Sequence, residues 1–426
     1  RSAAMTVLDP TADIDFDDPG ALFVLPRLWA DMDAWHERVA RLRRETPIVP
    51  VDFAGFAPFW VLTRHADIQA VERDHNHWLN TPFSVLGPDV QQAEVEASGM
   101  PLPASLVQLD GTKHRTHRAV TNDWFKPAAV GSRQERIDAI ADEYVAKMRD
   151  MGGACDFASD IAQPYTLHVI MEIYGVPEED EPLMRELTQG IFGAADPEYG
   201  GDDPQAAMVG SVMRFIAYFN ELTEARRAEP TEDLATVIAN AMIDGAPMGD
   251  VERLWYYIIV ATAGHDTTSY GLSGGMEALL HNPSQLFSLA GDHDRIVRAT
   301  EEVIRWTTPV RHFLRYASEG TEVGGVKIPA GGRVLLSYPS ANRDEDVFAN
   351  AMTFDVDRPD ADRQLSFGAG VHFCLGAHFA RREIRTMLGK LSEQLESIEA
   401  AGDPSYSQSH FVSGVKHLPV TYRFKN

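Results

Sequence analysis

One cysteine stands in a setting suited to binding a metal. The segment 367–376 reads Phe-Gly-Ala-Gly-Val-His-Phe-Cys-Leu-Gly, and an amphipathic pattern starts near Ala377. We expect the Cys374 thiol to lie at a helix N-terminus, where the dipole and free amides stabilise a thiolate able to ligate a metal or act as a nucleophile. Gly370 and Gly376 would let the backbone pass close to a flat macrocycle. The alternative is a buried core cysteine beside an ordinary glycine turn.

A second group with chemical potential is Ala-Gly-His-Asp-Thr-Thr at 263–268. It lies inside the most apolar segment of the chain, where burying Asp266 is costly without a reason. Gly264 removes a side chain, and Thr267 can donate to the carbonyl of Ala263, so we expect the helix to open locally into a groove. The alternative to a catalytic role is that the threonine and the aspartate only form hydrogen bonds with the backbone of their own helix.

Glu302 and Arg305 lie one turn apart on a predicted helix, where they can pair and hold a third partner. Such pairs are commonly solvated contacts, and that alternative stays open from the spacing alone.

The elements that must position these residues are mostly helical. Apolar residues recur at helical spacing over 133–150, 292–306 and 377–395, and 251–280 is apolar enough for a central buried helix. Strands are fewer: we expect one pair at 48–53 and 59–63 and another at 324–328 and 333–336. The fold class is therefore mainly α with small β-sheets (α+β), in a single domain that can host a bulky cofactor.

Composition narrows the partners. The net charge of −25 over 426 residues argues against nucleic acid and anionic membranes, and the apolar stretch 254–264 is shorter than the roughly 20 residues of a spanning helix. Two cysteines, Cys155 and Cys374, imply no disulfide framework.

We expect residues 1–20 to form an acidic arm, with 1–4 added ahead of the native Met5, and 21–426 to form the catalytic domain. The turn-rich patch 196–204 is too short to separate domains, and a cytoplasmic location is the default.

The cysteine segment resembles the haem-binding signature of the cytochrome P-450 family, Phe-x-x-Gly-x-x-x-Cys-x-Gly, at every specified position. The resemblance spans nearly the whole chain. It implies a haem-thiolate monooxygenase with the P-450 fold, haem b as cofactor and Cys374 as the iron ligand. Phe367, Gly368 and Gly376 would contact the macrocycle.

The same resemblance assigns further roles. Glu302, Arg305 and Arg358 are similar to the family triad that braces the cysteine loop, which is structural and not catalytic. Gly264, Asp266 and Thr267 resemble the oxygen-activation motif, whose acid and alcohol help to deliver protons to dioxygen. The propionate partners would be His114, Arg118, Arg315 and His372.

The family inserts one oxygen atom of dioxygen into a substrate C–H bond and reduces the other to water. Too few residues follow the last predicted helix for a reductase domain, so electrons must come from a partner. By resemblance this partner is an iron-sulfur ferredoxin fed by an NAD(P)H-dependent reductase. The expected docking residues are Lys113, Arg115, Arg381 and Arg382, because an acidic ferredoxin needs a local basic patch.

The segment 175–180 and the Gly-His-Asp wording at 264–266 look like the alpha-terpineol-hydroxylating bacterial branch. His265 is polar where many relatives carry an apolar residue. We expect a small hydrophobic substrate of the monoterpenoid or alkylbenzene type, contacted from the segments 81–109, 191–213, 261–268 and 310–313. The expected pocket residues are Phe83, Val85, Leu86, Met100, Leu102, Ala263, Val310 and Phe313.

Two other functions remain open from the sequence. A peroxide-driven haem-thiolate hydroxylase would share the cysteine loop, but such relatives replace the acid and the alcohol found at Asp266 and Thr267. A non-catalytic haem-thiolate sensor of gas or redox state would need no proton relay.

Overall fold

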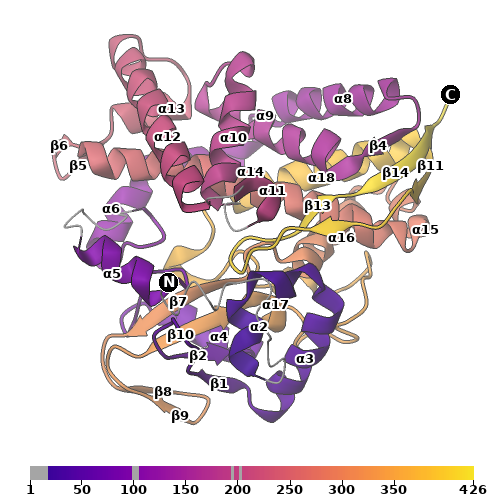
Figure 1. Ribbon diagram of the computed structural model, residues 1–426. Coiled ribbons are helices and arrows are strands. Elements are labelled where there is room, and N and C mark those ends of the chain that lie inside the picture. The colour runs from indigo at the N-terminus through magenta and orange to yellow at the C-terminus, as the bar shows by residue number, and fades with distance from the viewer. Residues whose placement is uncertain (1–17, 98–104, 193–195, 201–203) are drawn as a thin grey trace.

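Helices make up most of the described chain, as the sequence predicted (Figure 1). The computed structural model describes residues 18–97, 105–192, 196–200 and 204–426, so nearly all of the predicted acidic arm, and also Met100 and Leu102, lie outside the described residues. The helices and short helical turns are α2 (Pro19–Val24), η1 (Pro26–Ala30), α3 (Met32–Glu45), α4 (His65–Arg73), α5 (Asp89–Ala97), α6 (Gly111–Thr121), η2 (Asn122–Phe125), α7 (Pro127–Gly131), α8 (Gln134–Asp150), η3 (Phe157–Ala162), α9 (Gln163–Tyr174), η4 (Glu178–Asp180), α10 (Glu181–Phe192), α11 (Pro197–Gly200), α12 (Pro204–Ala228), α13 (Leu234–Ala239), α14 (Asp250–Leu280), α15 (Pro283–Phe287), α16 (His293–Thr307), α17 (Tyr338–Ala341), η5 (Ala361–Arg363), η6 (Gly370–His372) and α18 (Ala377–Gln394).

The strands form small sheets. The main sheet has the order β1-β2-β10-β7-β3, in which β10 runs parallel to β2 and the other neighbours are antiparallel. A second sheet has the order β11-β14-β4, and three two-stranded ribbons complete the set. The strands are β1 (Ile48–Val51), β2 (Phe59–Leu62), β3 (Trp78–Leu79), β4 (Ala154–Asp156), β5 (Met242–Ile243), β6 (Ala246–Pro247), β7 (His312–Ala317), β8 (Thr321–Val323), β9 (Val326–Ile328), β10 (Arg333–Ser337), β11 (Leu395–Ala400), β12 (Ser405–Tyr406), β13 (Val415–His417) and β14 (Pro419–Phe424).

The helix predictions are confirmed to within two residues at each end. The predicted ranges 133–150, 251–280, 292–306 and 377–395 correspond to α8, α14, α16 and α18. Asp292 caps α16 by accepting a hydrogen bond from the amide of Arg295 at 2.9 Å. The inward stripe of α16 includes Ile296, Ala299 and Val303, all buried at the spacing of an amphipathic helix.

One strand pairing was wrong. The predicted hairpin at 48–63 is confirmed, but 324–328 does not pair with 333–336. Gly324 and Gly325 have φ of 53° and 83° and form a two-residue turn that pairs β9 with β8. The strand β10 pairs instead with β7 and β2. The sequence pattern marked the strands but did not encode their partners.

The central position of α14 organises the fold. In Figure 1 it runs beneath α9, α10 and α12, while the main sheet with α2, α3 and α4 forms a separate lobe below. Most of α14 is buried, and it packs against α9, α16 and α18 within the largest hydrophobic core. The helix therefore lies between the helical lobe and the sheet lobe, with most of its residues buried.

None of the described helices combines the length and the hydrophobicity that crossing a bilayer requires.

Candidate active site

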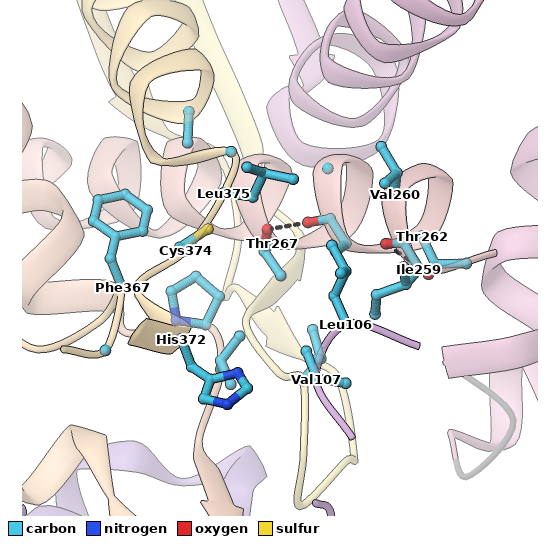
Figure 2. A pocket seen from close by; sticks show the side chains of 18 of the residues that line it. Leu106, Val107, Ile259, Val260, Thr262, Thr267, Phe367, His372, Cys374 and Leu375 are labelled. Atoms are coloured by element: carbon cyan, nitrogen blue, oxygen red, sulfur yellow. Dashed lines mark hydrogen bonds between the residues drawn. The ribbon is translucent and has the colours of Figure 1, made fainter. Parts of the chain in front are cut away.

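A largely apolar cavity lies between α14 and the segment that precedes α18. Figure 2 shows the sulfur of Cys374 and the hydroxyl of Thr267 at this cavity, with Leu106 and Val107 coming from another segment. Its volume is about 360 Å³, which falls in the size range of ligand sites. The predicted site residues on its wall are His114, Arg118, Ala263, Gly264, Thr267, Arg315, Phe367, Gly368, His372, Cys374 and Gly376. Four separate parts of the sequence thus meet at one cavity.

The cysteine segment forms a tight loop. The amide of Cys374 donates to the carbonyl of Phe367 at 2.9 Å, which closes the loop just before α18 begins at Ala377. Gly370 has φ of 69°, and a Cβ there would lie 2.4 Å from the carbonyl oxygen of Glu72 in α4. The expected role of Gly370 was wrong, because it allows close packing against α4, not against a macrocycle. At Gly376 a Cβ would meet no described atom within 4 Å.

The Cys374 side chain is open to the cavity but lies deep within the protein. This removal from bulk water raises the pKa of the Cys374 thiol, and the amides of Gly376 and Ala377 with the guanidinium of Arg118 act in the opposite direction. The helix start therefore stabilises the thiolate, as expected. Without a metal, however, burial has the larger effect on the pKa of Cys374. A metal cation at the sulfur is the further charge that would favour the thiolate.

Glu302, Arg305 and Arg358 form a buried ion-pair cluster. Arg305 binds the Glu302 carboxylate through two nitrogens, at 2.7 and 2.8 Å, and Nε of Arg358 lies 3.0 Å from Oε2 of Glu302. The exposed fractions of the three residues are 0%, 0% and 5%. The alternative of a solvated surface pair therefore does not apply.

Asn342, which the sequence analysis missed, links this cluster to the cysteine loop. Its carbonyl accepts from Nη1 of Arg305 at 2.7 Å. Its side-chain oxygen accepts from the amide of Leu365 at 2.7 Å, and its side-chain nitrogen donates to Ser366 Oγ at 2.8 Å. Ser366 also donates to the carbonyl of Ile304 at 2.8 Å. The ion-pair cluster thus fixes the start of the loop through one amide side chain.

Thr267 makes the predicted bond within α14. Its hydroxyl donates to the carbonyl of Ala263 at 2.7 Å, drawn as a dashed line in Figure 2. The expected local opening was wrong, because α14 is continuous from Asp250 to Leu280. Gly264 has a second role, since a Cβ there would lie 3.0 Å from Cδ1 of Ile170 in α9. The glycine therefore lets α9 and α14 approach closely beside the cavity.

Asp266 does not belong to the cavity wall. It is 5% exposed and faces His265, whose Nδ1 lies 3.2 Å from Asp266 Oδ1 and 3.2 Å from the hydroxyl of Thr188 in α10. Burial raises the pKa of the Asp266 carboxyl, and the neighbouring His265 only partly opposes this. The carboxyl next to Thr267 therefore holds a proton more readily than an exposed aspartate.

The four predicted propionate partners gather at one end of the cavity. The rings of His114 and His372 stack with centroids 4.0 Å apart, and Arg118 donates to the carbonyl of Phe373 at 2.7 Å. Burial and the neighbouring Arg118 lower the pKa of His114 to about 4. Burial, His114 and Arg315 lower the pKa of His372 to about 2. Two arginines beside two imidazoles make this end suited to carboxylates.

The residues around the cavity fit a haem, and the structure itself gives the reasons. His114 Nε2 is buried with no hydrogen-bond partner among the described residues, and it belongs to the cavity wall beside both arginines. Propionate oxygens would satisfy it. A thiol open to the same cavity and a glycine with free space at 376 suit a flat macrocycle bound through its iron.

Glu72 is a cavity residue that the sequence analysis missed. Its Oε1 accepts from the hydroxyl of Tyr338 at 2.6 Å and lies 3.5 Å from Nη2 of Arg315, while its Oε2 has no described partner. Burial raises the pKa of Glu72 to about 7, and Arg315 opposes this. Its pattern in the sequence is that of an ordinary helix-surface glutamate, so no local signal separated it from the others.

Four of the eight expected substrate contacts lie on the cavity wall. Val85, Ala263, Val310 and Phe313 belong to its wall. The prediction for Leu86 was wrong, because this residue is only 2% exposed and lies in the core of the sheet lobe. Phe83 is half-buried but outside the wall, and Met100 and Leu102 lie outside the described residues. The wall residues that the prediction missed include Trp255, Ile259, Val260, Phe411 and Val412.

Known proteins resemble this chain over almost all of its length. Residues 205–398 match the protein family described as Cytochrome P450. Cytochrome P450-terp of a Pseudomonas species is 37% identical over 411 residues, covering 94% of this chain and 96% of that protein. A steroid C26-monooxygenase of Mycolicibacterium smegmatis is 33% identical and covers 97% and 95%. The crystal structure of CYP108D1 from Novosphingobium aromaticivorans superposes with a TM-score of 0.88 at 39% identity, covering 95% and 98%.

Proposed function

Because this chain belongs to the cytochrome P450 family of monooxygenases, we propose that it hydroxylates a small hydrophobic molecule of the monoterpenoid or alkylbenzene class. The family uses dioxygen and external redox partners, and the electrons here come from an iron-sulfur ferredoxin. The observation that carries the proposal is the apolar wall that faces Cys374 and Thr267 in one cavity. We also propose that residues 21–426 act as one catalytic domain, since the cavity wall draws on residues from 72 to 412.

Haem b would be held by Cys374 at its iron and by His114, Arg118, Arg315 and His372 at its propionates. When bound, it supplies the iron chemistry that inserts one atom of dioxygen into a C–H bond and reduces the other to water. Phe367, Gly368 and Gly376 would line one face of the ring. The Glu302, Arg305 and Arg358 cluster would keep the loop in place through Asn342.

Thr267 would accept a hydrogen bond at the cavity wall, and Asp266, buried outside that wall, would be the source of protons. The proton of the Thr267 hydroxyl is engaged by the Ala263 carbonyl, so the lone pairs of Oγ1 remain to accept a hydrogen bond on the cavity side. The raised pKa of Asp266 suits an acid that keeps a proton behind Thr267 until it is needed. His265 would orient that carboxyl through its Nδ1.

Replacing Thr267 by alanine is expected to uncouple the reaction. Substrate should still bind, and NAD(P)H should still be consumed through the ferredoxin system, but product per NAD(P)H should fall by about ten-fold or more, since a positioned proton-transfer group contributes about 10²–10⁴-fold. The measurement is product yield against NAD(P)H consumed and hydrogen peroxide released. Thr267→Ser is the matched control, because it keeps the hydroxyl.

Full coupling in Thr267→Ala would contradict this role and favour the peroxide-driven alternative, in which oxygen and electrons arrive together as hydrogen peroxide. Direct addition of peroxide to both variants separates the two. The proposed enzyme depends on the ferredoxin system for most of its turnover.

The substrate class follows from the wall chemistry. Leu106, Val107, Ile259, Val310 and Phe313 offer no charge to a ligand near Thr267. A ligand that displaces water from ferric iron shifts the Soret band, so monoterpenes and alkylbenzenes can be ranked by titration. We expect saturating shifts with these compounds and none with carboxylate analogues of the same size, whose charge would be desolvated without a partner. Tighter binding of the carboxylates would overturn the assignment.

The sensor alternative predicts ligand shifts without turnover. NAD(P)H oxidation through the ferredoxin system with no hydroxylated product from any compound that shifts the Soret band would favour it.

The redox partner would dock on the face that carries the cysteine loop. Two of the four expected contacts are already paired within the protein: Lys113 lies 3.0 Å from Glu252, and Arg381 binds Glu301 at 2.6 Å. Arg115 is exposed and donates to the neutral Thr112, and Arg382 is half-exposed on the first turns of α18. Arg115 and Arg382 are therefore the stronger candidates to contact an acidic ferredoxin.

Reversing the charge of Arg115 to glutamate is expected to raise the ferredoxin concentration needed for half-maximal turnover by about ten-fold at low ionic strength, because steering by surface charge changes association rates by about 10–10³-fold. The effect should shrink as salt is added. Arg41→Glu is the control, since Arg41 is an exposed arginine on α3 in the other lobe. Equal effects of both variants would argue against a localised docking site.

A further inference from the structure

A second group of metal-binding side chains lies outside the active site, where α8, α9 and the start of α10 meet. Glu143 of α8, His168 of α9 and Glu178 of η4 each bring one ligand atom to within 4.8 Å of the others. Glu181, the first residue of α10, adds a carboxylate oxygen 3.6 Å from Nδ1 of His168. Three of these side chains therefore form one cluster, and Glu181 lies beside its imidazole.

A sharp turn in the chain creates this arrangement. Gly175 ends α9 in the left-handed region at φ of 71°, and a Cβ there would overlap the carboxylate of Asp233. The chain then reverses through Pro177 and returns Glu178 and Glu181 to the side of α9 that carries His168. Only a glycine fits this position, so the turn fixes the acidic residues over the imidazole.

His168 points into this group with an unsatisfied nitrogen. The residue is 4% exposed, and its Nδ1 has no hydrogen-bond partner among the described residues. The nearest carboxylate oxygen, on Glu181, is beyond hydrogen-bond distance at 3.6 Å. A buried imidazole nitrogen is normally satisfied, and an unsatisfied one beside the Glu181 carboxylate, on a residue that clusters with Glu143 and Glu178, suits a metal ligand.

The charges around His168 also lack balance. The carboxylates of Glu143, Glu178 and Glu181 all lie around the His168 imidazole. Lys147 partly offsets this charge, with Nζ 3.1 Å from Oε1 of Glu143 and 4.2 Å from the centroid of the Tyr144 ring. Arg136 also lies near His168 but is paired with Glu172 at 2.9 Å. The acidic side chains therefore outnumber the cations at this group, which makes it attractive to a divalent cation.

We infer that Glu143, His168, Glu178 and Glu181 form a binding site for Zn²⁺. One imidazole nitrogen with carboxylate oxygens is a ligand set that zinc accepts at about 2.0–2.2 Å in tetrahedral geometry. Calcium and magnesium prefer oxygen ligands alone, so the histidine selects against them. The exposed side chain of Glu178 would turn inward to complete the coordination.

Zinc at this point would tie together helices that shape the active-site cavity. Thr166 of α9 donates to the carbonyl of His265 at 3.3 Å, and Ile170 of α9 packs against Gly264. At its other end α10 carries Thr188, which contacts His265, and Ile191, which lies on the cavity wall. The metal would therefore fix the start of α10, a helix that covers the cavity, relative to α9.

The test is a calorimetric titration of the haem-loaded, chelator-treated protein with zinc chloride, with magnesium chloride as the comparison salt. We expect one equivalent of zinc to bind with micromolar or tighter affinity and magnesium not to compete at equal concentration. His168→Gln and Glu181→Gln should each weaken the binding by ten-fold or more. Lys147→Ala should tighten it by several-fold, because it removes a cation that competes for Glu143.

His77→Gln is the matched control, because Nδ1 of His77 lies 2.8 Å from Asp74 and Nε2 lies 3.2 Å from Glu319 at an exposed site. Zinc K-edge absorption should show imidazole together with oxygen ligands. Circular dichroism and an unchanged Soret band show that each variant is folded. The inference is overturned if no stoichiometric site is found, if His168→Gln binds zinc as the parent does, or if His77→Gln loses as much affinity.

Discussion

Cys374→Ala is expected to abolish the red-shifted absorption of the reduced, carbon-monoxide-bound protein and to lower hydroxylation more than about 100-fold. Loss of a residue that only orients a metal ligand costs roughly 10–100-fold in affinity or activity, so loss of the ligand itself should cost more. The thiol is open to the cavity shared with Thr267, and its loop is fixed by the bond from the Cys374 amide to Phe367. Absorption spectra and product formation measure the two effects.

The second cysteine provides the control. Cys155 lies half-buried in β4, where burial raises the pKa of its thiol to about 12, and it is not part of the cavity wall. Cys155→Ala should keep the red-shifted absorption and the activity. Retention of that absorption in Cys374→Ala would remove the foundation of the proposed function.

The sequence predicted the helices well because their evidence is local. In α16 and α18 the apolar residues repeat at helical spacing, and Asp292 marks the start of α16. The cysteine loop was also predictable, because its residue types and spacing lie within ten consecutive positions. Strand pairing is not local: β10 lies beside β2, about 270 positions earlier in the chain, and nothing within β10 specifies that neighbour.

Site residues could be predicted where they belong to a sequence motif. They could not be predicted where only tertiary packing brings them to the cavity. Glu72 reaches the cavity because α4 packs against the cysteine loop at Gly370, and its sequence surroundings do not indicate this. Asp266 is adjacent to Thr267 in sequence but faces His265 and α10, because successive residues of a helix point about 100° apart. Phe411 and Val412 reach the cavity wall through the bridge between Val310 and Val412, far from any motif.

Glu302→Gln is expected to destabilise the protein by about 3–5 kcal/mol, the usual cost of removing one partner from a buried ion pair. The carboxylate is 0% exposed and accepts bonds from Arg305 and from the amide of Asp355, with Arg358 at 3.0 Å. The neutral amide would leave the buried guanidinium of Arg305 without the carboxylate that it binds, and would leave Arg358 with Asp360 alone, whose Oδ1 lies 3.7 Å from its Nη1. Urea unfolding followed by circular dichroism measures the loss, and the Soret band reports whether haem is retained.

Glu45→Gln is the control for this prediction, because Glu45 also pairs with an arginine on its own helix, Arg41, but at 62% and 73% exposed side chains. An exposed pair of this kind contributes about 0.3–0.5 kcal/mol, so the control should unfold nearly as the parent does. Since Asn342 joins the buried cluster to Leu365 and Ser366, Glu302→Gln should also release haem at a lower urea concentration than global unfolding requires. Equal stability of the two variants would show that the buried Glu302 carboxylate does not stabilise the protein. In that case the ion-pair cluster could not be what holds the cysteine loop in place against α14.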